Sequence, residues 1–224
     1  MSLNADKHPP RSFFSFPKTT IIFLVIAALA LAGVWLATSR QSTAQALHRK
    51  ARLLMDTEVQ IVFQADSTAE EVSDQVFDEM ERLESRFSRS LRESELSTIN
   101  ARAGEGPVKV SPATLDLIEQ ALHYSDLSGG AFDPTIAPLL DRWGFLEENY
   151  RVPPDSEIEA FLPLVDYTMV KVDRHRQEVS LLKEGMRLDL GGVAKGYIID
   201  RGVDRLQQAG VSHGFIDAGG DIRI

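Results

Sequence analysis

Two glycine-containing segments hold residues whose types and spacing could bind a ligand, one through a phosphate and the other through close approach of a flat group. The first runs from Asp189 to Gly196 (DLGGVAKG), between a predicted strand and a predicted helix. Such a junction offers free backbone amides and the positive end of a helix dipole, which both favour phosphate. Lys195 could reach that phosphate, and Asp189 could accept a hydrogen bond from a ligand or help to hold a cation. The glycine spacing fits neither a Walker loop nor a Rossmann fingerprint, and a tight turn beside a solvated lysine explains these residues equally well.

The second segment is Ser128–Thr135 (SGGAFDPT). Asp133 before Pro134 predicts a helix N-cap, and the glycines predict the end of the preceding helix. This local role leaves Gly130 and Phe132 unexplained. A backbone without side chains next to an aromatic ring suits the close approach of a flat ligand, although this signal alone is weak.

Composition excludes several classes of function. The 224 residues include no cysteine, which excludes a disulfide scaffold, a thiolate metal site and a cysteine nucleophile. There are 24 basic and 33 acidic residues, a net charge of −9, so nucleic acid is not expected as a partner. The five histidines show no ligand spacing and are expected at structural or surface positions.

The N-terminal part differs from the rest of the chain. Residues 19–39 carry no charge, and at about 1.5 Å per residue they span roughly the 30 Å of a bilayer core. The sequence therefore predicts a cytoplasmic segment at residues 1–18, a signal-anchor or transmembrane helix at 19–39, a linker at 40–52 and one globular domain at 53–224. A buried core helix is the alternative for 19–39. Because three cations precede the apolar run, we expect the globular part to be exported.

The elements that must position the two segments alternate between strand and helix. Residues 55–63 alternate like a half-buried strand, and Ser67, three residues before Glu70, predicts a capped helix to Phe87. Residues 90–107 are expected to form a loop. Ser111 before Pro112 predicts a helix that ends at Gly129. The remaining predictions are an antiparallel meander at 167–173, 178–182 and 186–190, a helix over 193–208, and two short strands at 213–217 and 221–224.

Taken together, the ordered segments resemble the FAD:protein FMN transferase (ApbE) family. They are SGGAFDPTIAPLLDRWGF at 128–145, LDLGGVAKGYIID at 188–200 and GGDIRI at 219–224, with weaker matches at 55–57 and 87–100. The resemblance implies an α+β fold related to T-fold proteins. It also implies transfer of FMN from FAD to a Thr or Ser hydroxyl of an acceptor protein, with Mg²⁺ and release of AMP. The implied acceptors are subunits of membrane or periplasmic electron-transfer complexes, and the implied location is the bacterial inner membrane with the globular part periplasmic.

Carried over position by position, the resemblance assigns FAD binding and one metal contact to particular residues. FAD binding falls to Met55, Ala131, Phe132, Asp133, Asp189 and Lys195, and the backbone carbonyl of Gly192 falls to the metal. No catalytic residue is assigned. Asp56 stands where the family usually has Gly, and Ser90 stands in the place of a frequent Tyr.

The family continues beyond the point that corresponds to Ile224 with a histidine-bearing segment and an Asp/Thr motif that supplies most metal ligands. This sequence is therefore interpreted as the N-terminal part of a transferase, and flavin transfer by it alone is not expected. A member that binds FAD or a partner without catalysis, and an inactive fragment, are the alternatives. Whether the open reading frame continues with the metal motif would distinguish them.

Overall fold

The computed structural model describes residues 18–39, 46–64, 67–146 and 149–224, which belong to two compact units, residues 1–45 and 46–224. In the first unit, α1 covers Lys18–Ser39. None of the helices in the described part of the chain meets the length and apolarity needed to cross a membrane. Of the cytoplasmic segment expected at residues 1–18, the structure describes only Lys18. Of the linker expected at 40–52, residues 40–45 lie outside the described residues.

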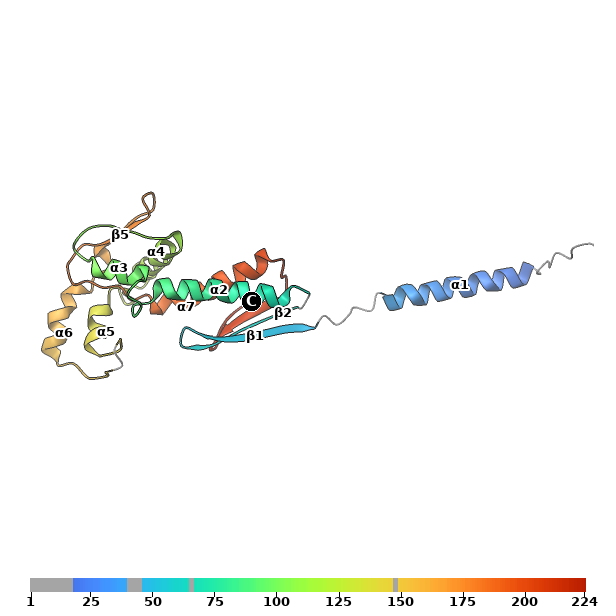
Figure 1. Ribbon diagram of the computed structural model, residues 1–224, viewed down its shortest axis with the longest axis horizontal. Coiled ribbons are helices and arrows are strands. Elements are labelled where there is room, and N and C mark those ends of the chain that lie inside the picture. The colour runs from blue at the N-terminus through green and yellow to red at the C-terminus, as the bar shows by residue number, and fades with distance from the viewer. Residues whose placement is uncertain (1–17, 40–45, 65–66, 147–148) are drawn as a thin grey trace, which may run out of the picture. The chain divides into compact units, whose positions relative to one another are not determined.

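The second unit contains a four-stranded antiparallel sheet in the order β1-β2-β6-β7 (Figure 1). Its strands are β1 Leu47–Leu54, β2 Thr57–Gln64, β6 Gly214–Ala218 and β7 Asp221–Arg223. The turn Met55–Asp56 joins β1 to β2, with Leu54 opposite Thr57. Both turn residues have positive φ, 52° and 57°, a conformation that glycine or asparagine adopts more readily.

Two long helices, α2 Ala69–Phe87 and α7 Gly191–Gln208, lie side by side and pack on this sheet (Figure 1). Their apolar residues recur at helical spacing, so each helix buries one stripe against the strands. The shared core contains Val59, Ile61, Phe63, Val76, Phe77, Met80, Leu83, Ile198, Ile199, Val203, Leu206 and Ile216. The face of β1 towards α2 is polar instead: Lys50 pairs with Glu70 and Asp74, and Arg52 with Asp74.

The remaining elements form a second layer around the three-stranded antiparallel sheet β3-β5-β4. They are α3 Glu95–Ala101, β3 Val108–Lys109, α4 Pro112–Leu127, α5 Ala137–Arg142, α6 Asp155–Phe161, β4 Val170–Asp173 and β5 Glu178–Leu181. Two short 3₁₀ helices at Leu162–Leu164 and Tyr167–Met169 complete them. The α+β class is confirmed.

Several element predictions are confirmed. Ser111 caps α4 by accepting a hydrogen bond from the amide of Thr114. Helix α7 ends before Gly210, which has a φ of +85°, and the turn Gly219–Gly220 separates β6 from β7. The helix predicted to end at Phe87 does end there, but Thr68 rather than Ser67 is its N-cap residue.

Other predictions are wrong. The loop expected at 90–107 contains α3, which Ser94 caps by accepting from the amide of Ser97 at 2.9 Å. Residues 186–190 are not a strand, because β3 takes the place beside β5 and only Arg187 forms a bridge, to Ile136. The predicted linker at 40–52 contains most of β1.

Candidate functional site

The junction before α7 is built around the carboxylate of Asp189. Its Oδ1 accepts a hydrogen bond from the amide of Gly191 at 2.8 Å, and its backbone amide donates to the carbonyl of Pro134 at 2.7 Å. Asp189, the residue before the N-cap Leu190, therefore holds the first amide of α7 and also ties this turn to the segment around Pro134. The two segments singled out in the sequence meet here, although more than fifty residues separate them.

Phe132 lies against Gly192 of this turn. A Cβ added to Gly192 would lie 3.0 Å from Cε2 of the Phe132 ring, which is closer than an ordinary contact. A side chain at this position would therefore press on the ring, whereas the backbone torsion of Gly192 does not call for glycine. Ala131, the neighbouring residue assigned to FAD, is exposed. The ring of Phe132 and the first turn of α7 are therefore in contact, and the exposed Ala131 lies next to them in the chain.

Asp133 is used inside the protein. Its Oδ1 accepts from the amide and the hydroxyl of Thr135, at 2.8 and 2.6 Å, and its Oδ2 accepts from the amide of Tyr167 at 3.0 Å. The expectation that Asp133 caps a helix is wrong, because α5 begins only at Ala137, after Ile136. The pKa of the Tyr167 hydroxyl is raised, chiefly by its hydrogen bond to the carboxylate of Asp126. The hydrogen bonds that Asp133 accepts from Thr135 and Tyr167 therefore hold the loop that carries Phe132.

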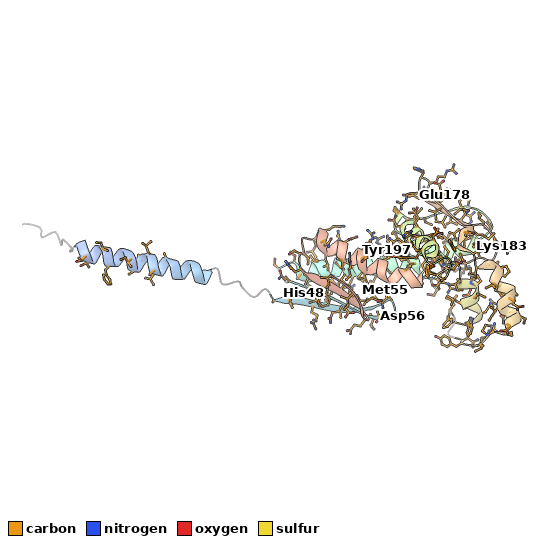
Figure 2. The ribbon with its side chains drawn as sticks, turned by 180° about the vertical axis from the view of Figure 1, so that it is seen from behind. His48, Met55, Asp56, Glu178, Lys183 and Tyr197 are labelled. Carbon is orange, nitrogen blue, oxygen red and sulfur yellow. The ribbon has the colours of Figure 1, made fainter. Side chains whose placement is uncertain are left out.

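Lys195 extends the site to the sheet. Its Nζ lies 2.9 Å from Oδ2 of Asp221, the first residue of β7. The turn before β7 touches the β1–β2 hairpin, because a Cβ on Gly219 would lie 2.3 Å from Oγ1 of Thr57. The end of that hairpin carries Met55 (Figure 2). The amide of Met55 donates to Oε1 of Glu84 at 2.8 Å. A continuous set of contacts thus runs from Lys195 through β7 to the hairpin.

Arg89 is a residue that sequence reasoning missed. Its Nη1 donates to Oδ2 of Asp189 at 2.8 Å, and its Nη2 pairs with Asp141 of α5. Arg187 donates to the other oxygen of Asp141 at 2.9 Å. Only the position of Arg89, next to Ser90, could have drawn attention to it. Asp141 and Asp189 lie 52 and 100 residues from Arg89 in the sequence, so no local spacing indicates that they pair with it.

A cavity of about 310 Å³ opens beside this network. Its lining consists of Arg89, Ser90, Arg92, Ser97, Asn100, Ala101, Leu146 and Arg187. Three arginines and no acidic side chain line it, but Arg89 and Arg187 already pair with Asp141 and Asp189, so Arg92 is the cation left to meet an anionic group. Arg92 has no hydrogen bond or ion pair within the described part of the chain, and its guanidinium remains available.

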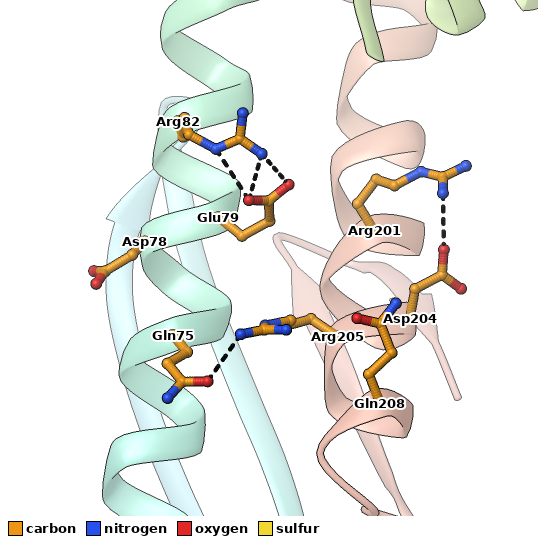
Figure 3. A pocket seen from close by; sticks show the side chains of 8 residues that line it. All are labelled: Gln75, Asp78, Glu79, Arg82, Arg201, Asp204, Arg205 and Gln208. Carbon is orange, nitrogen blue, oxygen red and sulfur yellow. Dashed lines mark hydrogen bonds and ion pairs between the residues drawn. The ribbon is translucent and has the colours of Figure 1, made fainter. Parts of the chain in front are cut away.

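A larger cavity, of about 510 Å³, lies between α2 and α7 (Figure 3). It is lined by Gln75, Asp78, Glu79, Arg82, Arg201, Asp204, Arg205 and Gln208. Two of the three acids pair with arginines of the lining, Glu79 with Arg82 and Asp204 with Arg201, while Arg205 donates to the amide oxygen of Gln75. The third acid, Asp78, pairs with Arg52. Since most of these charges already have partners, the cavity is interpreted as a solvated polar face.

The described residues do not by themselves fit a divalent metal. They contain no group of three or more His, Asp or Glu side chains that could hold an ion. Mg²⁺ wants near-octahedral oxygen coordination, usually with one or two carboxylates. Asp133 and Asp189 are engaged in the hydrogen bonds above, which leaves the carbonyl of Gly192 as the single assigned oxygen.

Comparison with known proteins identifies the relationship. The sequence model of the ApbE family matches residues 55–224, which is most of the chain. The chain belongs to the ApbE family. A protein of Klebsiella pneumoniae (strain 342) named FAD:protein FMN transferase is 35% identical over 162 residues, which cover 72% of this chain and 51% of that protein. A protein of the same name from Treponema pallidum is 29% identical over 183 residues.

Solved ApbE structures agree with the fold. The crystal structure of the ApbE protein from Thermotoga maritima is 34% identical, with a TM-score of 0.74 over 80% of this chain and 59% of that one. The flavin transferase ApbE from Vibrio cholerae is 27% identical, also with a TM-score of 0.74. The chain spans about half the length of the curated relatives that it matches. The site described above is therefore part of an ApbE fold.

Proposed function

We propose that this chain is the FAD-binding part of an FAD:protein FMN transferase. The observation that carries the proposal is the junction of Asp189, Gly192 and Phe132, where two segments typical of ApbE proteins meet at the start of a helix. The relatives named FAD:protein FMN transferase support the same reaction. Gly191 and Gly192 carry no side chain that would keep a phosphate from the first turn of α7, and the ring of Phe132 suits a flat heterocycle.

In the proposed reaction, a Thr or Ser hydroxyl of an acceptor protein attacks the phosphorus of the FMN half of FAD. A bond forms between the hydroxyl oxygen and this phosphorus, the bond to the bridging oxygen breaks, and AMP leaves. The hydroxyl proton passes to solvent. Such a transfer depends on positioning and charge more than on covalent help from the protein. Here Lys195 would approach the diphosphate, and Met55, Ala131 and Phe132 would contact the nucleotide.

Mg²⁺ is part of the proposal through the family resemblance, with Gly192 as one ligand. A second candidate function is FAD binding without transfer. Titration with FAD, followed by flavin fluorescence, tests the binding that both candidates share. Incubation with FAD, Mg²⁺ and an ApbE acceptor protein, followed by mass spectrometry, separates them, because only the transferase adds the mass of FMN to the acceptor.

We also propose that residues 19–39 anchor the protein in the bacterial inner membrane, with the second unit in the periplasm. Support comes from the uncharged sequence and from exposed apolar side chains on α1, among them Phe23, Leu29 and Leu31. The proposed acceptors are flavoprotein subunits of membrane or periplasmic electron-transfer complexes. A reporter enzyme fused after Ile224 tests the orientation. Activity only in the cytoplasm would overturn it.

A further inference from the structure

We propose that Arg89 is a positioning residue for the flavin-nucleotide site, acting through Asp189; this inference rests on the proposed function. Arg89 lies in the segment that follows α2, outside both glycine-containing segments. Its side chain is 11% exposed, and the side chains of its partners Asp141 and Asp189 are 11% and 22% exposed. An arginine so far removed from water needs its charge matched, and here two carboxylates from different elements match it.

The fork of the guanidinium makes this arrangement possible. One terminal nitrogen of Arg89 serves Asp189 and the other serves Asp141, so a single rigid plane joins the start of α7 to α5. A lysine carries the same charge on one nitrogen and cannot reproduce this fixed, two-sided geometry. Since Arg187 holds the second oxygen of Asp141, the position of that carboxylate is itself determined.

Arg89 thereby sets the orientation of the Asp189 carboxylate. With Oδ2 held by Arg89, Oδ1 is directed at the amide of Gly191, the first residue of α7. The next residue, Gly192, is the one in close contact with Phe132. Arg89 therefore reaches the ligand-facing surface through Asp189 and the helix turn, without itself belonging to either segment.

Arg89 also neutralises the site. Without it, the Asp189 carboxylate would lose its cation and act against a ligand that carries a negatively charged diphosphate, whereas Asp141 would keep Arg187. Both the lost orientation and the exposed negative charge act against binding of that ligand, and both act through Asp189. If Arg89 only stabilised the fold, its replacement would not change the affinity for FAD in a way that depends on Asp189.

The test is a double-mutant cycle in the full chain, read out as the dissociation constant of FAD by flavin fluorescence. We expect Arg89→Gln to weaken FAD binding about tenfold to a hundredfold, the range for loss of a charged hydrogen bond. Arg89→Lys should recover only part of this loss. In a chain that already carries Asp189→Asn, Arg89→Gln should weaken binding by less than about threefold, because the two residues act as one unit. The matched control is Arg176→Gln, an exposed arginine at a turn.

Thermal unfolding of each variant shows which variants remain folded, and the Arg89→Lys variant serves for the test if Arg89→Gln unfolds. Additive losses in the double variant, or an unchanged affinity in both Arg89 variants, would overturn the inference while leaving the proposed function intact. Failure of the unaltered chain to bind FAD would overturn the proposed function and this inference with it.

Discussion

Lys195 occupies a place where a charge can be removed with little effect on folding. Its side chain is 31% exposed and that of its partner Asp221 is 63% exposed, and ion pairs this open to water contribute little to stability. We expect Lys195→Met to change the free energy of unfolding by less than about 0.5 kcal/mol. The same change should weaken FAD binding about tenfold or more, because a diphosphate loses a cation. Chemical denaturation and fluorescence titration measure the two quantities, and equal affinities would leave Lys195 without a role in binding.

Gly192 is constrained by its neighbour. Because a Cβ there would lie 3.0 Å from the ring of Phe132, Gly192→Ala forces the ring or the helix to move. We expect destabilisation of about 1 kcal/mol, from overpacking partly offset by the better helix propensity of alanine. Phe132→Leu should relieve much of that cost in the double variant. Thermal melting of the two single variants and the double variant checks this coupling, and strictly additive shifts would contradict it.

At the scale of elements, Glu95 joins the starts of α3 and α4. Its carboxylate accepts from the amide and hydroxyl of Ser111, each at 2.9 Å, and from the hydroxyl of Thr114 at 2.5 Å. Burial tends to raise the pKa of Glu95, but the hydrogen bonds from Thr114 and Ser111, with the nearby Arg86, outweigh it, so the pKa is lowered. The ionised form thus holds the two helix starts together.

This arrangement predicts a pH dependence with a definite sign. A lowered pKa in the folded state stabilises the protein fully above the unfolded value, about 4.3 for Glu. The stabilisation is lost as the pH falls from there through the folded pKa. We expect Glu95→Gln to cost about 1–3 kcal/mol at pH 7 and distinctly less near pH 3. Urea denaturation at both pH values measures the difference, and a cost that does not shrink in acid would refute the assignment.

Which elements the sequence predicts correctly depends on where their apolar residues lie. α2, α4 and α7 bury a regular stripe, and their periodicity identifies them. β1 was missed because its inward face is basic: Lys50 and Arg52 point at acids of α2 rather than at a core. Lysine and arginine are common on edge strands, where they discourage pairing with other chains. α3 was missed because only Leu96 and Ile99 are buried in its seven residues.

The features of the candidate site likewise divide into those that the sequence predicts and those that only the structure shows. Short-range features, such as the glycines before α7 and Phe132 near Gly130, can be read from the sequence. Contacts that join distant segments cannot, and Arg89 with Asp141 and Asp189 is the clearest case. The hydrogen bonds that engage Asp133 also required coordinates, since its partner Tyr167 is 34 residues away.

At the scale of the whole molecule, the hydrophobic core belongs to the second unit. In the described part of the chain, the buried apolar residues of this core lie between Leu54 and Ala218, and none of them comes from the first unit. We therefore expect residues 46–224, expressed alone, to melt cooperatively and to bind FAD with the affinity of the full chain. Circular dichroism and fluorescence titration check this. An unfolded product, or a loss of affinity, would show that the first forty-five residues contribute to the fold or to the site.

The two-residue turn at Met55–Asp56 has a consequence for the distribution of charge. It fixes which residues of β1 face α2, so Lys50 and Arg52 meet its acids while Arg49 and Ala51 face away. Side chains alternate along a strand, so slipping the pairing by one residue would exchange the two sets. Arg49 and Ala51 would then lie over α2, so its row of acids would face one cation of these positions in place of two. A single residue inserted into this turn would therefore exchange the inward and outward faces of all of β1.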